Sequence, residues 1–133
     1  MNVFATAGMC LQRVLEKNAS IKESVLGDDR IKAKGAVYAL VCETLKRYHG
    51  ILYLMRRSGL LRECSSLGQP PSEFLLAVLT YEVLFGKNSS VKRAGMPGKL
   101  VLSWRSRLDG IAKRDFPGNE GLVAPAVQQA MEL

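Results

Sequence analysis

The chain has 133 residues, of which 47% are hydrophobic and 23% are charged, a balance typical of a globular protein and not of a disordered one. Its longest apolar run, residues 74–79, is far shorter than the ~20 residues of a membrane-spanning helix, so we expect no membrane segment. The formal net charge of +7 favours a polyanionic partner, and the single histidine excludes a multi-histidine metal site.

The three cysteines, Cys10, Cys42 and Cys64, are far apart and have no C-x-x-C spacing. We interpret them as buried, reduced thiols, which implies an intracellular location. The first 15 residues lack the basic leader and the cleavage site of a secretory signal. They also contain no acidic residue, which leaves a mitochondrial transit peptide as the alternative to the amphipathic helix that we favour.

The N-terminal segment predicts two helices. Apolar residues recur at three- and four-residue steps over residues 2–17 and form one helical face. Ser20 and Glu23 then have the S-x-x-E spacing of a capping box, in which each side chain bonds to the other's free backbone N–H. A short helix over residues 21–26 should follow, with Gly27 at its end.

Residues 31–58 carry the strongest helical pattern in the chain, and Gly59 supplies a C-terminal stop. The segment is longer than a usual globular helix, so we expect a break at Gly35 or at His49-Gly50 and two or three successive helices. Residues 64–71 predict a linker because glycine and a proline pair interrupt regular structure there.

The following segment predicts the centre of the core. Ser72 is a natural N-cap, and residues 74–85 are apolar on almost every side, which is typical of a fully buried helix. A buried strand is the competing interpretation, but the length and the leucine content favour a helix.

The C-terminal third predicts one more well-defined helix. Residues 87–98 form a loop rich in glycine, serine and lysine, and Pro97 opens a helix that continues to about Arg114. A turn is expected at 116–119, and residues 120–133 are either a frayed helix or a linker. Because no segment shows the alternating pattern of a strand, the predicted fold class is all-α.

The positive charge is concentrated in one segment. Residues 1–86 carry a net charge of +3, residues 87–114 carry +7, and residues 115–133 carry −3. Such a concentration raises the local potential and favours a polyanionic partner such as nucleic acid, although a solvated helix face beside a mobile loop is an equally good interpretation. The candidate RNA-binding residues are Lys87, Lys92, Arg93, Lys99, Arg105, Arg107, Lys113 and Arg114.

No catalytic constellation is evident in the sequence. His49 beside Tyr48 is the candidate acid–base pair, but a histidine at a helix junction is far more often structural. Cys42 and Glu43 are adjacent on a helix and point about 100° apart, so they do not face one another as nucleophile and base. We expect Cys42 to pack inward as an inert thiol and Glu43 to pair with Arg47, and we predict no catalytic or metal-binding residue.

Two features of the basic segment have competing interpretations. The glycine-containing loop 86–98 lacks G-x-x-x-x-G-K-[ST], so it predicts a flexible contact with a phosphate backbone and not a nucleotide site. Tryptophan side chains can stack on an unpaired base, but the spacing of Trp104 with Val101 and Leu108 favours a place in the core.

Residues 38–87 contain motifs that resemble a known family. Tyr38 to Thr44 (YALVCET), Arg47-Tyr48 and Ser58 to Arg62 (SGLLR) are similar to the N-terminal region of the Sun-family RNA cytosine-5 methyltransferases. Leu79 to Lys87 (LTYEVLFGK) resembles the VYELLLGKG motif of the branch that methylates large-subunit ribosomal RNA, and Asn119-Glu120 falls where that branch has an acidic RNED turn. The resemblance covers about residues 20–120.

The resemblance implies a NusB-like helical bundle of about six to seven helices over residues 1–118. Residues 119–133 would then be a tail or a truncated linker toward a methyltransferase core. In this family the core binds S-adenosylmethionine and uses two cysteines, whereas this sequence has no Pro-Cys or Thr-Cys-x-Pro motif. We therefore expect no cofactor and no catalysis in this segment, which would be a truncated or split form of a longer enzyme.

The resemblance also implies ribosomal RNA as the partner and the nucleus or nucleolus as the location. The main hypothesis is an RNA-binding domain that positions the substrate for the catalytic core. The first alternative is a protein–protein adaptor that docks a ribosome-assembly protein or the enzyme's own core. A free-standing antiterminator like NusB ranks last, because the motifs resemble the methyltransferase branch.

Overall fold

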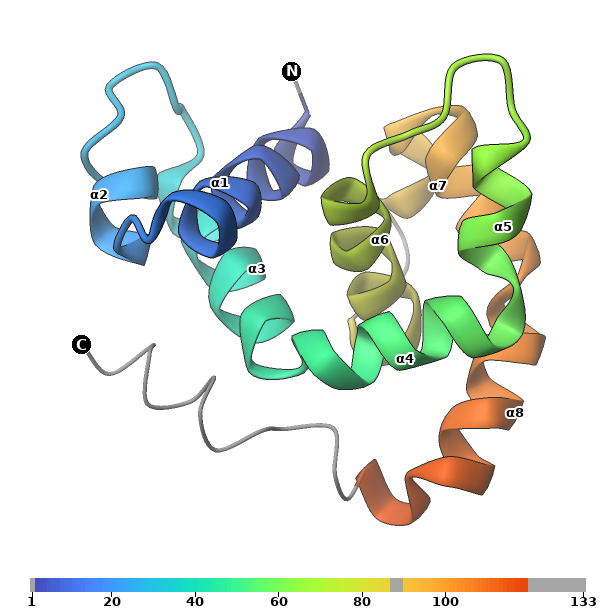
Figure 1. Cartoon of the computed structure of the whole chain (residues 1–133). Coiled ribbons are helices and arrows are strands. Elements are labelled where there is room, and N and C mark those ends of the chain that lie inside the picture. Colours follow the sequence, from blue (N-terminus) through green and yellow to red (C-terminus); the bar gives the residue numbers. More distant parts are fainter. Residues whose placement is uncertain (1, 87–89, 120–133) are drawn as a thin grey trace.

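The computed structural model describes residues 2–86 and 90–119. In these ranges the chain forms eight α-helices and two short 3₁₀-helices, η1 and η2, and no strand. The predicted all-α fold class is confirmed, with slightly more helices than expected. Figure 1 shows α6 in the middle, α1 to α3 on one side of it, and α5, α7 and α8 on the other, with α4 crossing beneath from α3 to α5.

The first two helices begin as the sequence predicts. Helix α1 spans Val3–Lys17, and the Asn2 side chain caps it by accepting a hydrogen bond from the Ala5 amide at 2.8 Å. Helix α2 spans Ile21–Val25, and the Ser20 hydroxyl accepts from the Glu23 amide at 3.0 Å. The serine half of the predicted capping box is therefore present.

The long helical segment breaks close to one of the predicted points. Helix α3 spans Lys34–Lys46 and helix α4 spans Tyr48–Ser58, with Arg47 (φ −109°, ψ 11°) between them. Gly35 lies in the first turn of α3 and does not interrupt the helix, so the prediction of a break at Gly35 was wrong. The break lets α3 pack against α1 while α4 turns toward α6 and α8, which one straight helix could not do.

Glycine ends α4, and a further helix follows it. Gly59 has the left-handed conformation (φ 89°) of a helix C-cap, as predicted. Helix α5, Leu60–Ser65, follows and includes the first two residues of the expected linker 64–71. It forms because Leu60 and Cys64, four residues apart, are both buried on one face.

Helix α6, Glu73–Phe85, is the centre of the fold. The Ser72 hydroxyl caps it by accepting from the Phe74 amide at 3.1 Å. Its buried residues face every direction, and it packs against α1, α3, α4, α7, α8 and η1. The helix prediction is confirmed over the strand alternative. The buried residues of α6 are Phe74, Leu76, Ala77, Val78, Leu79, Thr80 and Val83.

The predicted helix from Pro97 to Arg114 is in fact two helices. Helix α7 spans Met96–Ser103 and helix α8 spans Arg105–Asp115, and the chain turns between them at Trp104 (φ −96°, ψ 0°). Helix α7 packs against η1 and α6, whereas α8 packs chiefly against α4. A single straight helix could not bury its apolar residues against both neighbours, so the prediction of one helix was wrong.

Short elements flank these two helices. Part of the expected loop 87–98 is the 3₁₀-helix η1, Val91–Ala94, anchored by the fully buried Val91. The predicted turn after α8 is the 3₁₀-helix η2, Pro117–Asn119. The expected frayed helix or linker over 120–133 lies outside the described residues. In the described ranges, no helix is long and apolar enough to span a membrane.

Helices α1 and α6 approach each other closely at Gly8 in the core. Gly8 on α1 is buried, and a Cβ added there would lie 3.0 Å from the backbone Cα and N of Leu75 on α6. By contrast, a Cβ added at Gly110 on α8 would meet no neighbour within 4 Å. The absence of a side chain at Gly8 therefore sets the distance between the two helices.

We predict that Gly8→Val lowers the free energy of unfolding by about 1–3 kcal/mol, because the added methyl groups push α1 away from α6. The matched change Gly110→Val should stay within about 0.5 kcal/mol of the original chain, because its surroundings are open. Urea denaturation followed by circular dichroism measures both. Equal effects at the two positions would contradict the close approach of α1 and α6.

Candidate nucleic-acid interface

The predicted RNA-binding residues are on three consecutive elements, and all those in the described ranges are exposed. Lys92 and Arg93 are on η1, Lys99 is on α7, and α8 carries the others, Arg105, Arg107, Lys113 and Arg114. Lys87 lies outside the described residues. Because the buried residues of these elements face α6 and α4, their basic side chains are left on the outer surface.

The two basic residues at the end of α8 are already paired. Lys113 Nζ lies 2.9 Å from Asp109 Oδ2, and Arg114 Nε lies 3.0 Å from Asp115 Oδ1. The bond from Arg114 holds the pKa of Asp115 below its usual value, so this carboxylate stays ionised. These pairs reduce the net positive potential at that end of α8.

The remaining basic residues have no such partner. Among the described residues, no carboxylate lies within 4.0 Å of a cationic nitrogen of Lys92, Arg93, Lys99, Arg105 or Arg107. Their charges are therefore available to a polyanion, and these five residues are the stronger part of the predicted set.

Trp104 combines the two interpretations that the sequence left open. It is half-buried and packs on the core, with its Cη2 3.8 Å from the position of a Cβ added at Gly59. The Arg107 guanidinium lies over the ring, 4.3 Å from its centroid, in a cation–π contact. The indole thus lies beside both Gly59 and Arg107 and joins the end of α4 to the start of α8.

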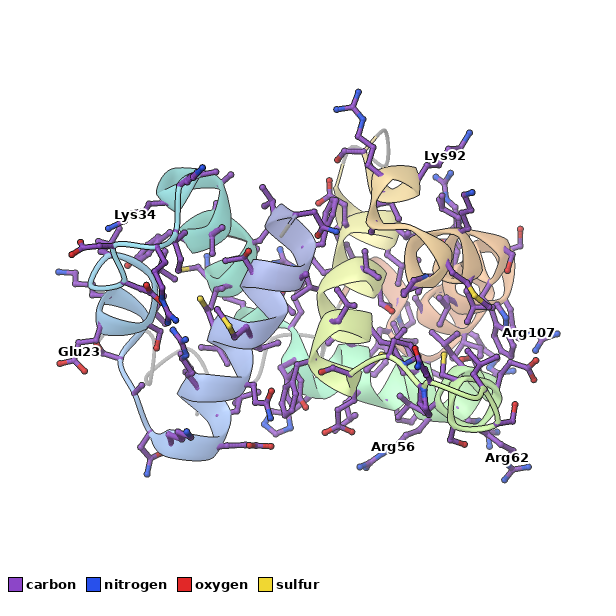
Figure 2. The ribbon with its side chains drawn as sticks, turned by 90° about the horizontal axis from the view of Figure 1, so that it is seen from above. Glu23, Lys34, Arg56, Arg62, Lys92 and Arg107 are labelled. Atoms are coloured by element: carbon purple, nitrogen blue, oxygen red, sulfur yellow. The ribbon has the colours of Figure 1, made fainter. Side chains whose placement is uncertain are left out.

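The structure adds basic residues that the sequence analysis missed. Arg56 and Arg57 on α4 and Arg62 on α5 are exposed, and in the described part of the chain none of them forms an ion pair. Figure 2 shows Arg56, Arg62, Arg107 and Lys92 around one end of the molecule, and Glu23 and Lys34 at the other.

A signal for these residues was present in the sequence. From residue 44 to residue 62 there are five basic residues and no acidic one. The positive charge of residues 44–62 is not visible in the net charge of residues 1–86, because acidic residues elsewhere in that range offset it.

The structure places the two candidate catalytic pairs in different surroundings. Glu43 pairs with Arg47 at 2.7 Å, as predicted, and does not contact Cys42 as a base. His49 is exposed on the first turn of α4, and its ring meets that of Tyr48 edge-on at 6.2 Å. No group of three or more potential metal ligands occurs among the described residues.

The three thiols differ in exposure. Cys10 and Cys64 are buried, whereas Cys42 is half-buried and so less enclosed than we predicted. Burial is the main cause that raises the pKa of each thiol above its usual value. A raised pKa lowers the thiolate fraction, which is the reactive form, so none of the three has the setting of an activated nucleophile.

We predict that iodoacetamide at pH 8 modifies Cys42 before Cys10 and Cys64, and that the latter two react at comparable rates only in urea. The reason is that reaction requires both a thiolate and access to solvent. Mass spectrometry of peptides at successive times measures the three rates. Rapid modification of Cys10 or Cys64 in the folded chain would contradict their burial.

By fold and surface, the chain is a small helical module with a basic end. A family model described as NOL1/NOP2/Sun domain family member 5, N-terminal domain, matches residues 35–114, which is more than half of the chain. The chain belongs to this family, and the resemblance to the N-terminal region of the Sun-family methyltransferases is confirmed. No match was found among curated proteins or among solved structures.

Proposed function

We propose that this chain is an RNA-binding N-terminal domain that positions ribosomal RNA for a cytosine-5 methyltransferase core. The family match supports the link to such an enzyme. The observation that carries the RNA-binding role is the set of exposed basic residues on η1, α7 and the start of α8, which pair with no carboxylate of the described residues. All of the predicted RNA-binding residues fall within the matched range.

The proposal divides the work between this domain and the core. The domain contributes charge and orientation, because contacts to phosphates fix the register of an RNA without chemistry of their own. The core would supply the cysteines and bind S-adenosylmethionine. In this proposal the helical domain itself takes no part in binding that cofactor.

Two further parts of the proposal follow from the family. A NusB-like arrangement of the bundle is compatible with the described helices, and the proposed role in ribosomal RNA modification implies the nucleus or nucleolus as the location. A free-standing antiterminator is disfavoured because the matching family is that of the Sun proteins.

A protein–protein adaptor is the second candidate, and one surface feature favours it. Met96 is 65% exposed beside a hollow of about 460 Å³ between the segment that follows α5 and helix α7. Exposed apolar side chains around a hollow are typical of a docking surface. The hollow is lined by Leu67, Gly68, Gln69, Pro71, Met96, Pro97 and Leu100.

We predict that changing Lys92, Lys99 and Arg105 to Glu together weakens binding to a ribosomal RNA fragment and reduces its salt dependence. Each lost phosphate contact should reduce the slope of log K against log salt concentration by roughly 0.7–0.9. Fluorescence anisotropy at several salt concentrations measures both quantities. One residue is taken from each of η1, α7 and α8, and Arg107 is left in place because it packs on Trp104.

The matched control changes Lys17, Lys22 and Lys32 to Glu. These three lysines are also exposed, but they lie on α1, α2 and the segment before α3. The control should retain most of the affinity and the original slope. Equal losses in both variants, or no RNA binding by the original chain, would refute the proposal. Capture of a protein partner that persists in high salt after ribonuclease treatment would favour the adaptor.

A further inference from the structure

A hollow on the surface of α4 is lined by residues outside the predicted RNA-binding set. It has a volume of about 460 Å³ and is lined by His49, Leu52, Tyr53, Arg56 and Arg57. All five residues belong to one helix, so their relative positions are fixed by its backbone. The lining of the hollow combines a leucine, a histidine, a tyrosine ring and two arginines.

The Tyr53 ring of this hollow is held in place by residues at the end of α8. The Tyr53 hydroxyl donates a hydrogen bond to Asp115 Oδ2 at 2.6 Å, and the ring packs edge-to-face with Phe116 at 5.2 Å. Tyr53 is nevertheless 41% exposed. A ring that is both fixed and exposed is ready to stack on a planar group with little loss of side-chain entropy.

The charges around Tyr53 favour an anionic ligand. Arg56 and Arg57 are exposed and, among the described residues, pair with no carboxylate. Asp115 is the acidic group in contact with Tyr53, and its charge is offset by Arg114 at 3.0 Å. The local balance is thus positive beside an exposed ring, which is the combination that proteins use for single-stranded nucleic acid.

We propose that this hollow binds one unpaired nucleotide of the RNA, with its base stacked on Tyr53 and its flanking phosphates on Arg56 and Arg57. This rests on the proposed RNA-binding function and gives it a second contact region outside residues 87–114. An acidic peptide would use the same two arginines, but it would have no use for the exposed ring.

The hollow is connected to the basic residues of α8 through the packing of α4. The Trp104 ring lies beside Gly59 at the end of α4, with Cη2 3.8 Å from the position of a Cβ added there, and the Arg107 guanidinium lies over this ring. Tyr53, near the middle of α4, contacts Asp115 and Phe116 at the end of α8. One RNA strand can therefore contact α4 and α8 together, and Figure 2 shows Arg56, Arg62 and Arg107 at this end of the molecule.

The test compares binding of the 133-residue chain to an unstructured 12-nucleotide RNA and to a 12-base-pair RNA duplex. Tyr53→Ala should weaken binding of the single strand about tenfold, as expected for the loss of one base stack, and leave the salt slope unchanged. Tyr53→Phe should keep most of the affinity, because it retains the ring and its packing on Phe116 although it loses the bond to Asp115. Arg56→Gln combined with Arg57→Gln should reduce the salt slope by about 1.4.

Two matched controls separate local effects from general ones. Tyr38→Ala removes a partly exposed tyrosine from α3, and Lys22→Gln with Lys32→Gln removes two exposed charges at the other end of the molecule. Both should bind RNA as the original chain does. Crosslinking of an oligonucleotide that contains 4-thiouridine, read by mass spectrometry, requires no variant to fold and should label the peptide around Tyr53.

The possible results distinguish this inference from the proposed function. If the chain binds RNA with a steep salt dependence but Tyr53→Ala has no effect and the crosslink lies elsewhere, the nucleotide site is refuted and the RNA-binding function stands. Equal or tighter binding of the duplex would also refute the stacking role. If the original chain binds neither RNA, both proposals fail.

Discussion

The burial of α6 on every side is the constraint on which the rest of the structure depends. A helix with apolar residues around its whole circumference must be covered all round, and here α1, α3, α4, α7, α8 and η1 cover it. A chain of this length can surround one helix only by turning repeatedly. The breaks at Arg47 and Trp104 provide two of those turns, and the close approach at Gly8 brings α1 against the α6 backbone.

The same constraint arranges the functional surface. Since α4, α7 and α8 direct most of their apolar residues inward, their charged residues face outward at one end of the molecule. Electrostatic contacts of this kind are individually weak in water, but several of them act together on a polyanion through the release of counterions. A rigid helical support for dispersed charges suits a domain that orients RNA, because orientation requires several fixed contacts and not one strong contact.

The contacts between α4 and α8 explain why aromatic side chains lie beside the charged residues on this surface. Trp104 and Tyr53 each occupy a contact between α4 and α8, one at the start of α8 and one at its end. Each also has a cationic neighbour, Arg107 for the indole and Arg56 or Arg57 for the phenol ring. The residues that hold α8 on α4 are thus also the ones that give the surface its aromatic character.

The sequence by itself determined the all-helical class, the helix ends at Ser20, Ser72 and Gly59, the central place of α6, and the basic character of residues 87–114. These features depend on spacing within one element, so periodicity reveals them. Only the tertiary structure decided the turn at Trp104, the surface formed by Arg56, Arg57 and Arg62, and the bond from Tyr53 to Asp115, which are 62 residues apart. Such features arise where two helices pack, and no local pattern specifies which side chains meet across that contact.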